Sequence, residues 1–313
     1  MWRMATVFHA DDFGITEAQA RSILALSDAC GGSGAIQSVS IFTNSPAFEA
    51  SCALARPYVE SGALRIGPHI NLVEGPSIGH SIKHGRHGGL VDQGGMLALD
   101  FVSLLRGALA GEHTQEALAG EVFAECRAQI ARFCEAFPEE RDHLRLDSHQ
   151  HVHMIPFVFD AMMNAAAACG CTVTDLRVSA EPLGPHLAAA PGRLASVNAV
   201  KNGLLGFLAP HVRHVAPKTC RIPVFCGVML SGRMDEADAA LIARMEDIAA
   251  KHGRDLEILT HPIAMQRQEC LDPDKTAFAE ACCADGRSRE AAFDASWHIG
   301  PDGRAVRGGS ALI

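Results

Sequence analysis

Residues 144–157, LRLDSHQHVHMIPF, place an aspartate and three histidines at every second position. The spacing predicts an extended strand, whose alternate residues share one face. That face would carry Asp147, His149, His151 and His153. Four titratable groups on one face are costly to bury without partners or a metal, and neutral imidazoles are good ligands for zinc and similar ions. The pattern therefore favours a functional site over an exposed edge strand.

Strand geometry limits how many of these side chains can bind one ion. Residues two apart on one face are separated by about 6.6–6.8 Å, whereas zinc binds nitrogen at about 2.0–2.1 Å. We therefore expect one ligand from this run, joined by ligands from other strands.

Polar residues also mark the other predicted strands, and parallel α/β folds place active sites at the carboxyl ends of their strands. Asp11 and Asp12 follow VFHA, His69 lies in GPHINL, and His261 follows LEILT. Two adjacent carboxylates could divide metal binding from proton transfer, but a turn in which one aspartate caps the next helix is equally consistent. His69 alone suits a core histidine as well as a ligand, and His261 suits a turn residue as well as a general acid.

The elements that must position these residues alternate between strands and helices. ATVFHA precedes the helical pattern TEAQARSILALSDAC, with Thr16 as the expected N-cap, and the alternation continues to LEILTHPI. Apolar strands in this order predict a parallel sheet covered by helices, either a barrel or a doubly wound sheet. The length predicts a single catalytic domain over residues 1–313.

Residues 182–226 interrupt this alternation. Six prolines surround the short apolar run VNAVKNGLLGFLAP. The run is too short, with Lys201 too near its middle, to be a transmembrane segment. We expect an insertion that acts as a lid or faces a partner.

Composition narrows the function further. The net charge of −9 argues against nucleic-acid binding through a broad basic surface, and the apolar fraction of 48% is that of a globular protein. The first residues, MWRMATVFHADDFG, do not form a secretory signal, so a cytoplasmic location is expected.

Five motifs together resemble the YdjC-like carbohydrate deacetylase family, which includes chitooligosaccharide deacetylases. HADDFG, IGPHINL, LDSHQHVHMIP, LRV and EILTHP occur in the order found in that family. SGRMDEA is similar to the hopanoid-associated branch, whereas DSHQHVH is closer to the ordinary family pattern. The resemblance implies an irregular (β/α) barrel with one divalent metal ion, acting on an N-acetylated sugar or glycoconjugate and releasing its acetyl group.

The resemblance also assigns roles to individual residues. Asp12, His69 and His149 correspond to the metal ligands of the family. Asp11 corresponds to the proposed catalytic base, and His261 to the histidine near the leaving amine. Protonation of that amine is needed because an amine anion is a poor leaving group.

Other positions receive supporting roles. Arg177, in DLRV, corresponds to a family arginine that orients Asp11 or the substrate. His151, His153 and Asn71 are assigned to substrate contact, the two histidines alternatively to support of the metal ligands. Zinc is the first expectation for the metal, with magnesium, nickel, cobalt, iron and manganese as alternatives. The family also suggests a homodimer by analogy.

Two other functions stay consistent with these residues. One is a metal-dependent hydrolase of another amide or of a phosphoester, although phosphoesterases often use two metal ions. The other is a sugar-binding protein without catalysis. A base and an acid beside the metal weigh against a simple binding protein.

Overall fold

The computed structural model describes residues 5–32, 34–79, 89–109 and 111–308. A sheet of seven parallel strands forms its centre, in the order β5-β4-β3-β2-β1-β7-β6. The strands are β1 (Thr6–Phe13), β2 (Ile36–Ile41), β3 (Arg65–Ile70), β4 (Leu144–Ser148), β5 (Val173–Leu176), β6 (Val224–Cys226) and β7 (Leu256–Thr260). Parallel strands bring their carboxyl ends to one side of the molecule.

The sheet curls until its two edge strands meet. A single parallel bridge joins Asp175 of β5 to Arg221, just before β6. The N–H of Arg221 donates to the carbonyl of Thr174 at 2.7 Å, and the N–H of Leu176 donates to the carbonyl of Arg221 at 2.9 Å. Pro223 has no N–H with which to extend this pairing. The predicted irregular barrel of parallel strands is confirmed.

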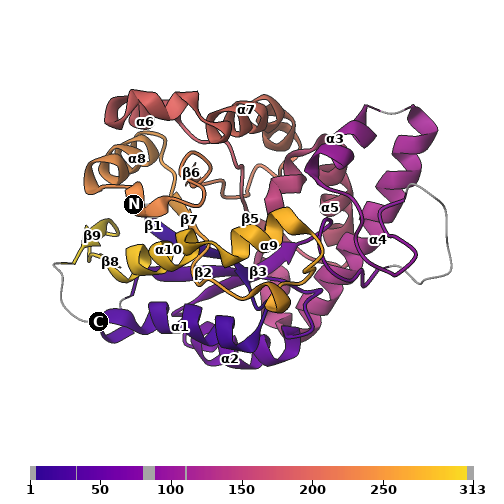
Figure 1. The fold of residues 1–313 in the computed structure, drawn as a ribbon, viewed down its shortest axis with the longest axis horizontal. Helices are drawn as coiled ribbons and strands as arrows, with labels where there is room; N and C mark the ends of the chain where they lie inside the picture. The colour runs from indigo at the N-terminus through magenta and orange to yellow at the C-terminus, as the bar shows by residue number, and fades with distance from the viewer. Residues whose placement is uncertain (1–4, 33, 80–88, 110, 309–313) are drawn as a thin grey trace.

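Helices cover the outside of this sheet (Figure 1). They are α1 (Glu17–Gly32), α2 (Phe48–Glu60), α3 (Phe101–Ala108), α4 (Glu112–Ala136), α5 (Pro156–Ala168), α6 (Leu183–Ala189), α7 (Val197–Val215), α8 (Ala239–Lys251), α9 (Thr276–Cys283) and α10 (Asp285–Ala295). In Figure 1, α1 and α2 lie below the sheet, α6 and α7 above it, and α9 and α10 cross its front. An antiparallel pair, β8 (Trp297–Ile299) and β9 (Ala305–Arg307), follows α10.

Strand β1 shows how the two faces of the sheet differ. Phe8 points outward and packs on Phe293 of α10 and on Trp297, with ring centroids 6.1 and 6.0 Å away. The next residue, His9, points into the barrel, where its ring nitrogens lie 2.8 and 3.1 Å from the hydroxyls of Ser38 and Ser40. Alternation along the strand thus separates an apolar outer layer from a polar barrel interior.

Helix α1 begins where the sequence predicts. The backbone N–H of Gln19 donates to the Thr16 hydroxyl at 3.1 Å, which satisfies one of the unpaired donors of the first turn. Thr16 is therefore the N-cap, as expected, and neither Asp11 nor Asp12 is needed for that purpose.

The predicted extended strand through Asp147 and His153 is wrong. Strand β4 ends at Ser148, and residues 149–154 form a short 3-10 segment with positive φ angles at Gln150 (52°) and His151 (60°). The backbone N–H of His153 donates to the Ser148 hydroxyl at 2.9 Å, which ties the turn back onto the strand. The alternation of polar residues therefore reflects a turn that buries its histidines in different surroundings.

The segment 182–226 contains α6, a 3-10 turn at Pro191–Ala195, and α7. Its last residues, Val224–Cys226, are strand β6 and pair with β7, so that part of the predicted insertion belongs to the barrel. Among the described residues, no helix combines the length and the apolar character needed to cross a membrane.

Close packing of β6 against β7 provides a test of the fold. A Cβ added at Gly227 would lie 2.6 Å from the Cβ of Leu259, whereas one added at Gly203 in α7 would meet nothing within 4 Å. We expect Gly227→Ala to lower the free energy of unfolding by about 1–3 kcal/mol through overpacking. Gly203→Ala, the matched control, should raise it by about 0.5–1 kcal/mol. Urea titration followed by circular dichroism measures both, and equal effects would contradict the close contact.

Candidate metal centre

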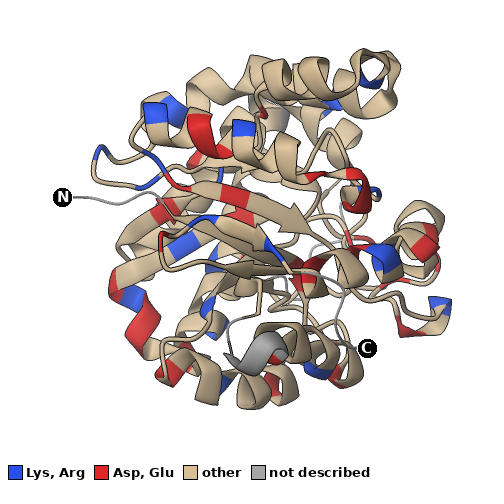
Figure 2. Ribbon diagram, turned by 90° about the vertical axis from the view of Figure 1, so that its left-hand side faces the viewer, with Lys and Arg blue, Asp and Glu red and all other residues tan. Residues whose placement is uncertain are grey.

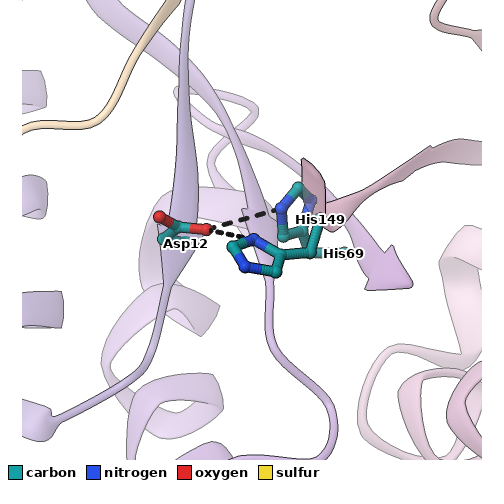
Figure 3. Close-up of side chains that lie close together, drawn as sticks. All are labelled: Asp12, His69 and His149. Atoms are coloured by element: carbon teal, nitrogen blue, oxygen red, sulfur yellow. Dashed lines mark hydrogen bonds and ion pairs between the residues drawn. The ribbon is translucent and has the colours of Figure 1, made fainter. Parts of the chain in front are cut away.

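Three side chains from the ends of three strands converge on one point (Figure 3). Asp12 lies near the end of β1, His69 lies in β3, and His149 directly follows β4. The Asp12 Oδ1 atom is 3.5 Å from His69 Nε2 and 3.0 Å from His149 Nδ1. One ligand atom from each residue lies within 4.8 Å of the other two. The three side chains are therefore close enough to share one ion.

Aromatic rings enclose this cluster. The Phe42 ring centroid lies 5.1 Å from that of His69 and 5.0 Å from that of His149, and the Phe278 centroid lies 4.6 Å from that of His149. Asp12, His69 and His149 are all buried. Electrostatic interactions in such an apolar enclosure are much stronger than in water.

A carboxylate behind His69 fixes which ring nitrogen faces the cluster. The His69 Nδ1 atom lies 2.7 Å from Asp147 Oδ1 and 2.9 Å from the Ser40 hydroxyl, while Nε2 faces Asp12. A proton on Nδ1 leaves the Nε2 lone pair free. Metal-binding histidines usually have a carboxylate partner of this kind, which also raises their basicity.

The cluster attracts positive charge. Burial lowers the pKa of His69, but the carboxylates of Asp11, Asp12 and Asp147 outweigh burial and raise it to about 10. Burial also opposes protonation of His149, and Asp12 again reverses the sign so that its pKa is raised. A divalent cation bound here would compensate the same carboxylates, with the two imidazoles as neutral ligands.

Three buried polar atoms at the cluster make no hydrogen bond within the described residues. One of them, Nη1 of Arg287, is only a donor, whereas His149 Nε2 and Glu74 Oε2 could each bind a cation. The other oxygen of Glu74 lies 3.8 Å from His149 Nε2. Because an unpaired buried polar atom is costly, these two atoms favour an additional bound group. The Asp12 carboxylate and the imidazoles of His69 and His149, with the unpaired atoms of His149 and Glu74 beside them, fit a divalent cation such as zinc.

Arg287 of α10 is a residue of this cluster that the sequence patterns did not reveal. Its Nη2 atom donates to Asp12 Oδ2 at 2.6 Å. Burial favours the protonated form of Asp12, but Arg287 and His149 hold the pKa of that carboxyl well below its usual range. Asp12 is therefore a carboxylate, with Oδ1 directed to the histidines and Oδ2 to the arginine.

Asp11 faces a different partner. Arg177 donates to both of its oxygens, from Nη1 to Oδ2 at 2.7 Å and from Nη2 to Oδ1 at 2.8 Å. Burial would raise the pKa of Asp11, but Arg177 holds it well below its usual range. The Arg177 side chain is fully buried, and its Nε donates to Glu257 at 2.6 Å. Arg177 therefore orients Asp11 from behind.

His261 lies near the cluster, where the charges of Asp12 and Asp11 act on it. It follows β7, and its side chain keeps 23% of its exposure. Its backbone N–H donates to Glu290 Oε2 at 2.6 Å, and the same oxygen is 3.8 Å from Nδ1. Burial lowers the pKa of the ring to about 4, so the imidazole is neutral near pH 7.

Two residues assigned to substrate contact make their hydrogen bonds inside the protein. The ring nitrogens of His153 lie 2.6 Å from the Ser148 hydroxyl and 3.0 Å from the Arg177 carbonyl. Asn71 accepts the backbone N–H of Val73 and Glu74 and donates to Glu74 and Asn44. Both side chains hold loops in place, and the geometry leaves them no polar atom for a sugar.

His151 is placed differently. Its Nδ1 lies 3.0 Å from the Ser179 hydroxyl, and its ring packs edge-on against Phe225. Burial lowers the pKa of His151 well below its usual value, and the nearby charge of Lys201 lowers it further. Lys201 comes from α7, so this histidine lies between the barrel and the helix that covers it.

Backbone strain concentrates around the same strand ends. Positive φ angles at residues other than glycine occur, among the described residues, at Asp12 (60°), Gln150 (52°), His151 (60°) and Ile263 (75°). These positions follow or end β1, β4 and β7. Such conformations cost about 1–3 kcal/mol each and persist mainly at functional sites.

A second group of potential ligands serves a structural purpose. Glu181 Oε2 accepts the backbone N–H groups of Gly227, Val228 and Met229 at 3.2, 2.9 and 2.8 Å. Its other oxygen lies 2.6 Å from His186 Nε2. With both oxygens committed, this carboxylate anchors α6 to the end of β6.

Comparison with known proteins places the chain among sugar-related enzymes. Residues 6–296 match the model of a protein family described as YdjC-like protein. A carbohydrate deacetylase of Mus musculus is 31% identical over 264 residues, which cover 83% of this chain and 78% of that protein. The chitooligosaccharide deacetylase of Enterobacter sp. strain 638 is 30% identical over 170 residues, 52% of this chain and 56% of that protein.

A solved structure shares the fold. It is described as a cellobiose-phosphate cleavage protein from Enterococcus faecalis V583 and is 19% identical, with a TM-score of 0.54. The match covers 94% of this chain and 95% of that one, so the similar architecture extends over nearly the whole barrel.

The contact between Asp147 and His69 yields a test of metal binding. We expect Asp147→Asn to weaken zinc affinity by about 10–100-fold, because the neutral amide no longer raises the basicity of the imidazole. Competition with a chromophoric chelator measures the affinity. Asp160→Asn is the matched control, because Asp160 Oδ1 lies 2.8 Å from His211 Nε2 in an Asp-His pair away from the cluster. Unchanged affinity in a folded Asp147→Asn protein would show that this carboxylate does not support a ligand.

Proposed function

The chain belongs to the YdjC-like family, and we propose that it is a metal-dependent carbohydrate deacetylase that removes the acetyl group from an N-acetylated amino sugar or glycoconjugate. The names of its mouse and human relatives, both carbohydrate deacetylases, support this activity. The human protein is 30% identical over 263 residues, 83% of this chain and 75% of that protein.

One observation carries the proposal. Asp12, His69 and His149 converge from three strand ends, and the carboxylate of Asp11 lies beside them. The Asp11 Oδ2 atom is 3.8 Å from His69 Nε2. An Asp-His-His set suits a divalent cation with open positions, and zinc is the metal we expect. A cation held there supplies an acidified water and polarises the acetyl carbonyl.

Asp11 is the proposed general base. Arg177 keeps it ionised and holds both of its oxygens, so the carboxylate cannot rotate away from the cluster. An ionised, fixed carboxylate can accept the proton of the attacking water. Arg177 acts as a positioning residue in this scheme.

His261 is the proposed general acid. Its neutral ring is partly exposed near the cluster, and before it can act as an acid it must receive a proton, either from solvent or the one that Asp11 accepts from the water. Glu290, 3.8 Å from Nδ1, faces the positive charge that the ring then carries. Transfer of this proton to the sugar nitrogen lets the amine depart as a neutral group.

The charge arrangement disfavours the alternative of a two-metal phosphoesterase. Another group of potential ligands, which consists of His9, Asp11 and Asp147, adjoins the cluster of Asp12, His69 and His149. Arg177 already donates to Asp11 and lies 3.2 Å from Asp147 Oδ2. A second cation would have to displace this buried guanidinium, so we expect one metal ion per chain.

We further propose that residues 1–313 act as one catalytic domain in which α6 and α7 cover the site. Lys201 of α7 is mostly buried, and its charge acts on Asp11 and on His151. Lys201 and His151 are the proposed sugar contacts on the side of the site that α7 covers. His153 and Asn71 are proposed to support the loops instead.

Substitution of the base tests the proposed reaction. We expect Asp11→Asn to slow acetate release by about 10²–10⁴-fold, because the amide cannot accept a proton, while bound zinc stays near one ion per chain. Asp247→Asn is the control, since Asp247 is exposed on α8. Acetate release is measured on N-acetylglucosamine oligomers, nucleotide-linked and lipid-linked N-acetylamino sugars after metal reconstitution.

Three results would overturn parts of this proposal. Full acetate release by a zinc-loaded Asp11→Asn protein would remove Asp11 as the base. Two zinc ions per chain with phosphate release from phosphoesters would favour the phosphoesterase. Zinc binding without turnover of any acetylated sugar by the unaltered protein would exclude the deacetylase.

A further inference from the structure

Residues 182–234 differ in charge from the rest of the chain. They contain six lysines and arginines and no aspartate or glutamate, in a protein whose net charge is −9. The basic residues are Arg193, Lys201, Arg213, Lys218, Arg221 and Arg233. In Figure 2 the helices along the top of the molecule, α6 and α7, are accordingly drawn in tan and blue.

Exposed apolar side chains gather in the same region. Eleven large apolar residues of the described chain are exposed, and eight of them lie between residues 183 and 215. Helix α7 carries four of these at a spacing of three or four residues, which places them on one side of the helix. We call this set the α7 apolar face; it consists of Val197, Val200, Leu204 and Phe207, which are 84%, 74%, 36% and 81% exposed.

The α7 apolar face has neighbours of the same kind. Leu183 and Leu187 of α6 and Leu194 of the connecting turn are also exposed. Helix α6 contacts that turn, and the turn contacts α7, so the three leucines belong to elements that adjoin α7. Contiguous exposed apolar surface of this kind marks protein or membrane interaction sites.

A basic cavity opens at the C-terminal end of α7. Its volume is about 880 Å³, and Arg213, Lys218 and Arg254 line it. Within the described part of the chain, no carboxylate forms an ion pair with any of these three. Burial and the neighbouring Arg254 lower the pKa of Arg213. We call this the basic cavity.

The basic cavity follows the α7 apolar face along the helix. His214, in the last turn of α7, lines the cavity and comes seven residues after Phe207, with Pro210 between them. The one acidic residue in the lining, Asp255, already accepts the backbone N–H of Ala5 at 2.8 Å. The cavity therefore offers cations beside an apolar surface.

We propose that the α7 apolar face and the basic cavity dock the protein on the surface of a membrane containing anionic lipids. The apolar side chains would enter the boundary between headgroups and acyl chains, as those of interfacial helices do. The guanidinium and ammonium groups of the basic cavity would meet lipid phosphates. This inference does not depend on the reaction that the site catalyses.

Charge favours a lipid surface over a second copy of the chain. A two-fold interface pairs the same surface patch with itself. Here it would bring Arg193, Arg213 and Lys218 of both copies together, and residues 182–234 contain no aspartate or glutamate. Arg221 and Arg233 are already paired with Asp175 and Glu236, and Lys201 is largely buried, so these three add little to the repulsion. Like charges placed opposite one another disfavour such a pairing, whereas an anionic surface is complementary.

Helix α7 lies between the α7 apolar face and the candidate metal centre. Val200 points outward, whereas the next residue, Lys201, is partly buried and acts through its charge on His151 and Asp11. Consecutive helical residues point about 100° apart, so one helix can meet both a membrane and the site. A docked protein would hold this side of the site close to the lipid surface.

Vesicle co-sedimentation of the full chain tests the proposal. We expect the protein to sediment with vesicles of phosphatidylcholine and phosphatidylglycerol and to stay in solution with phosphatidylcholine alone. Val200→Ser/Phe207→Ser should lower the partition coefficient by about tenfold or more. Arg213→Gln/Lys218→Gln should lower it by about thirtyfold, from about 1 kcal/mol per basic residue, and added salt should act in the same direction.

The matched control is Val102→Ser/Val306→Ser, which removes two exposed valines far from α7 in sequence and should leave partitioning unchanged. Thermal melts check that every variant is folded. Failure of the unaltered protein to bind the anionic vesicles, or equal binding by Val200→Ser/Phe207→Ser, would overturn the proposal. A stable dimer in light scattering that Val200→Ser/Phe207→Ser dissociates would also overturn the proposal, because a second copy of the chain would then cover the α7 apolar face.

Discussion

The paired hydrogen bonds between Arg177 and Asp11 are the interaction on which the polar interior of the barrel depends. Arg177 is fully buried and also contacts Asp147 and Glu257, so one cation compensates three carboxylates. Arg145 adds a second cation, 2.8 Å from Glu257. Removal of one partner from such a buried set typically costs about 3–5 kcal/mol, because it leaves uncompensated charge. Through Asp147, which contacts His69, the same network sets the geometry of the candidate metal centre.

Strand-end patterns could mark candidate ligands because parallel strands deliver their ends to one place, and the family resemblance then selected three of them. Asp12, His69 and His149 are each recognisable from a strand end or from the motif around it, and the structure brings them together. His9 was missed although it lies two residues before Asp11, on the same face of β1. Arg287 could not be predicted, since nothing in the spacing of α10 relates it to β1. The alternation of polar residues after Asp147 also could not show that residues 149–154 form a turn and not a strand, because the turn depends on contacts with residues far away in the sequence.

Backbone geometry explains how neighbouring aspartates face different partners. In a regular strand Asp11 and Asp12 would point to opposite faces of the sheet, but the register of β1 against β2 shifts between Ala10 and Phe13. The positive φ of Asp12 falls within this shift. Gln19 donates to the carbonyl of Asp12 at 2.7 Å and helps to hold this strained conformation. The cost of the strain is thus offset by contacts within the first strand and helix.

The barrel is closed only weakly at the seam, the place where β5 meets the residues just before β6. Two backbone hydrogen bonds at Arg221 and one from its side chain to Asp175 hold it, and cavities of about 230 and 880 Å³ both reach Arg221 and Pro223. Regions with few contacts open locally at a lower free energy than the global transition. We therefore expect local opening of the barrel to begin at this seam, opposite β2, and the amide of Leu176 to exchange its hydrogen before those of β1 and β2. The strands that carry Asp12 and His69 would then stay paired while the seam opens.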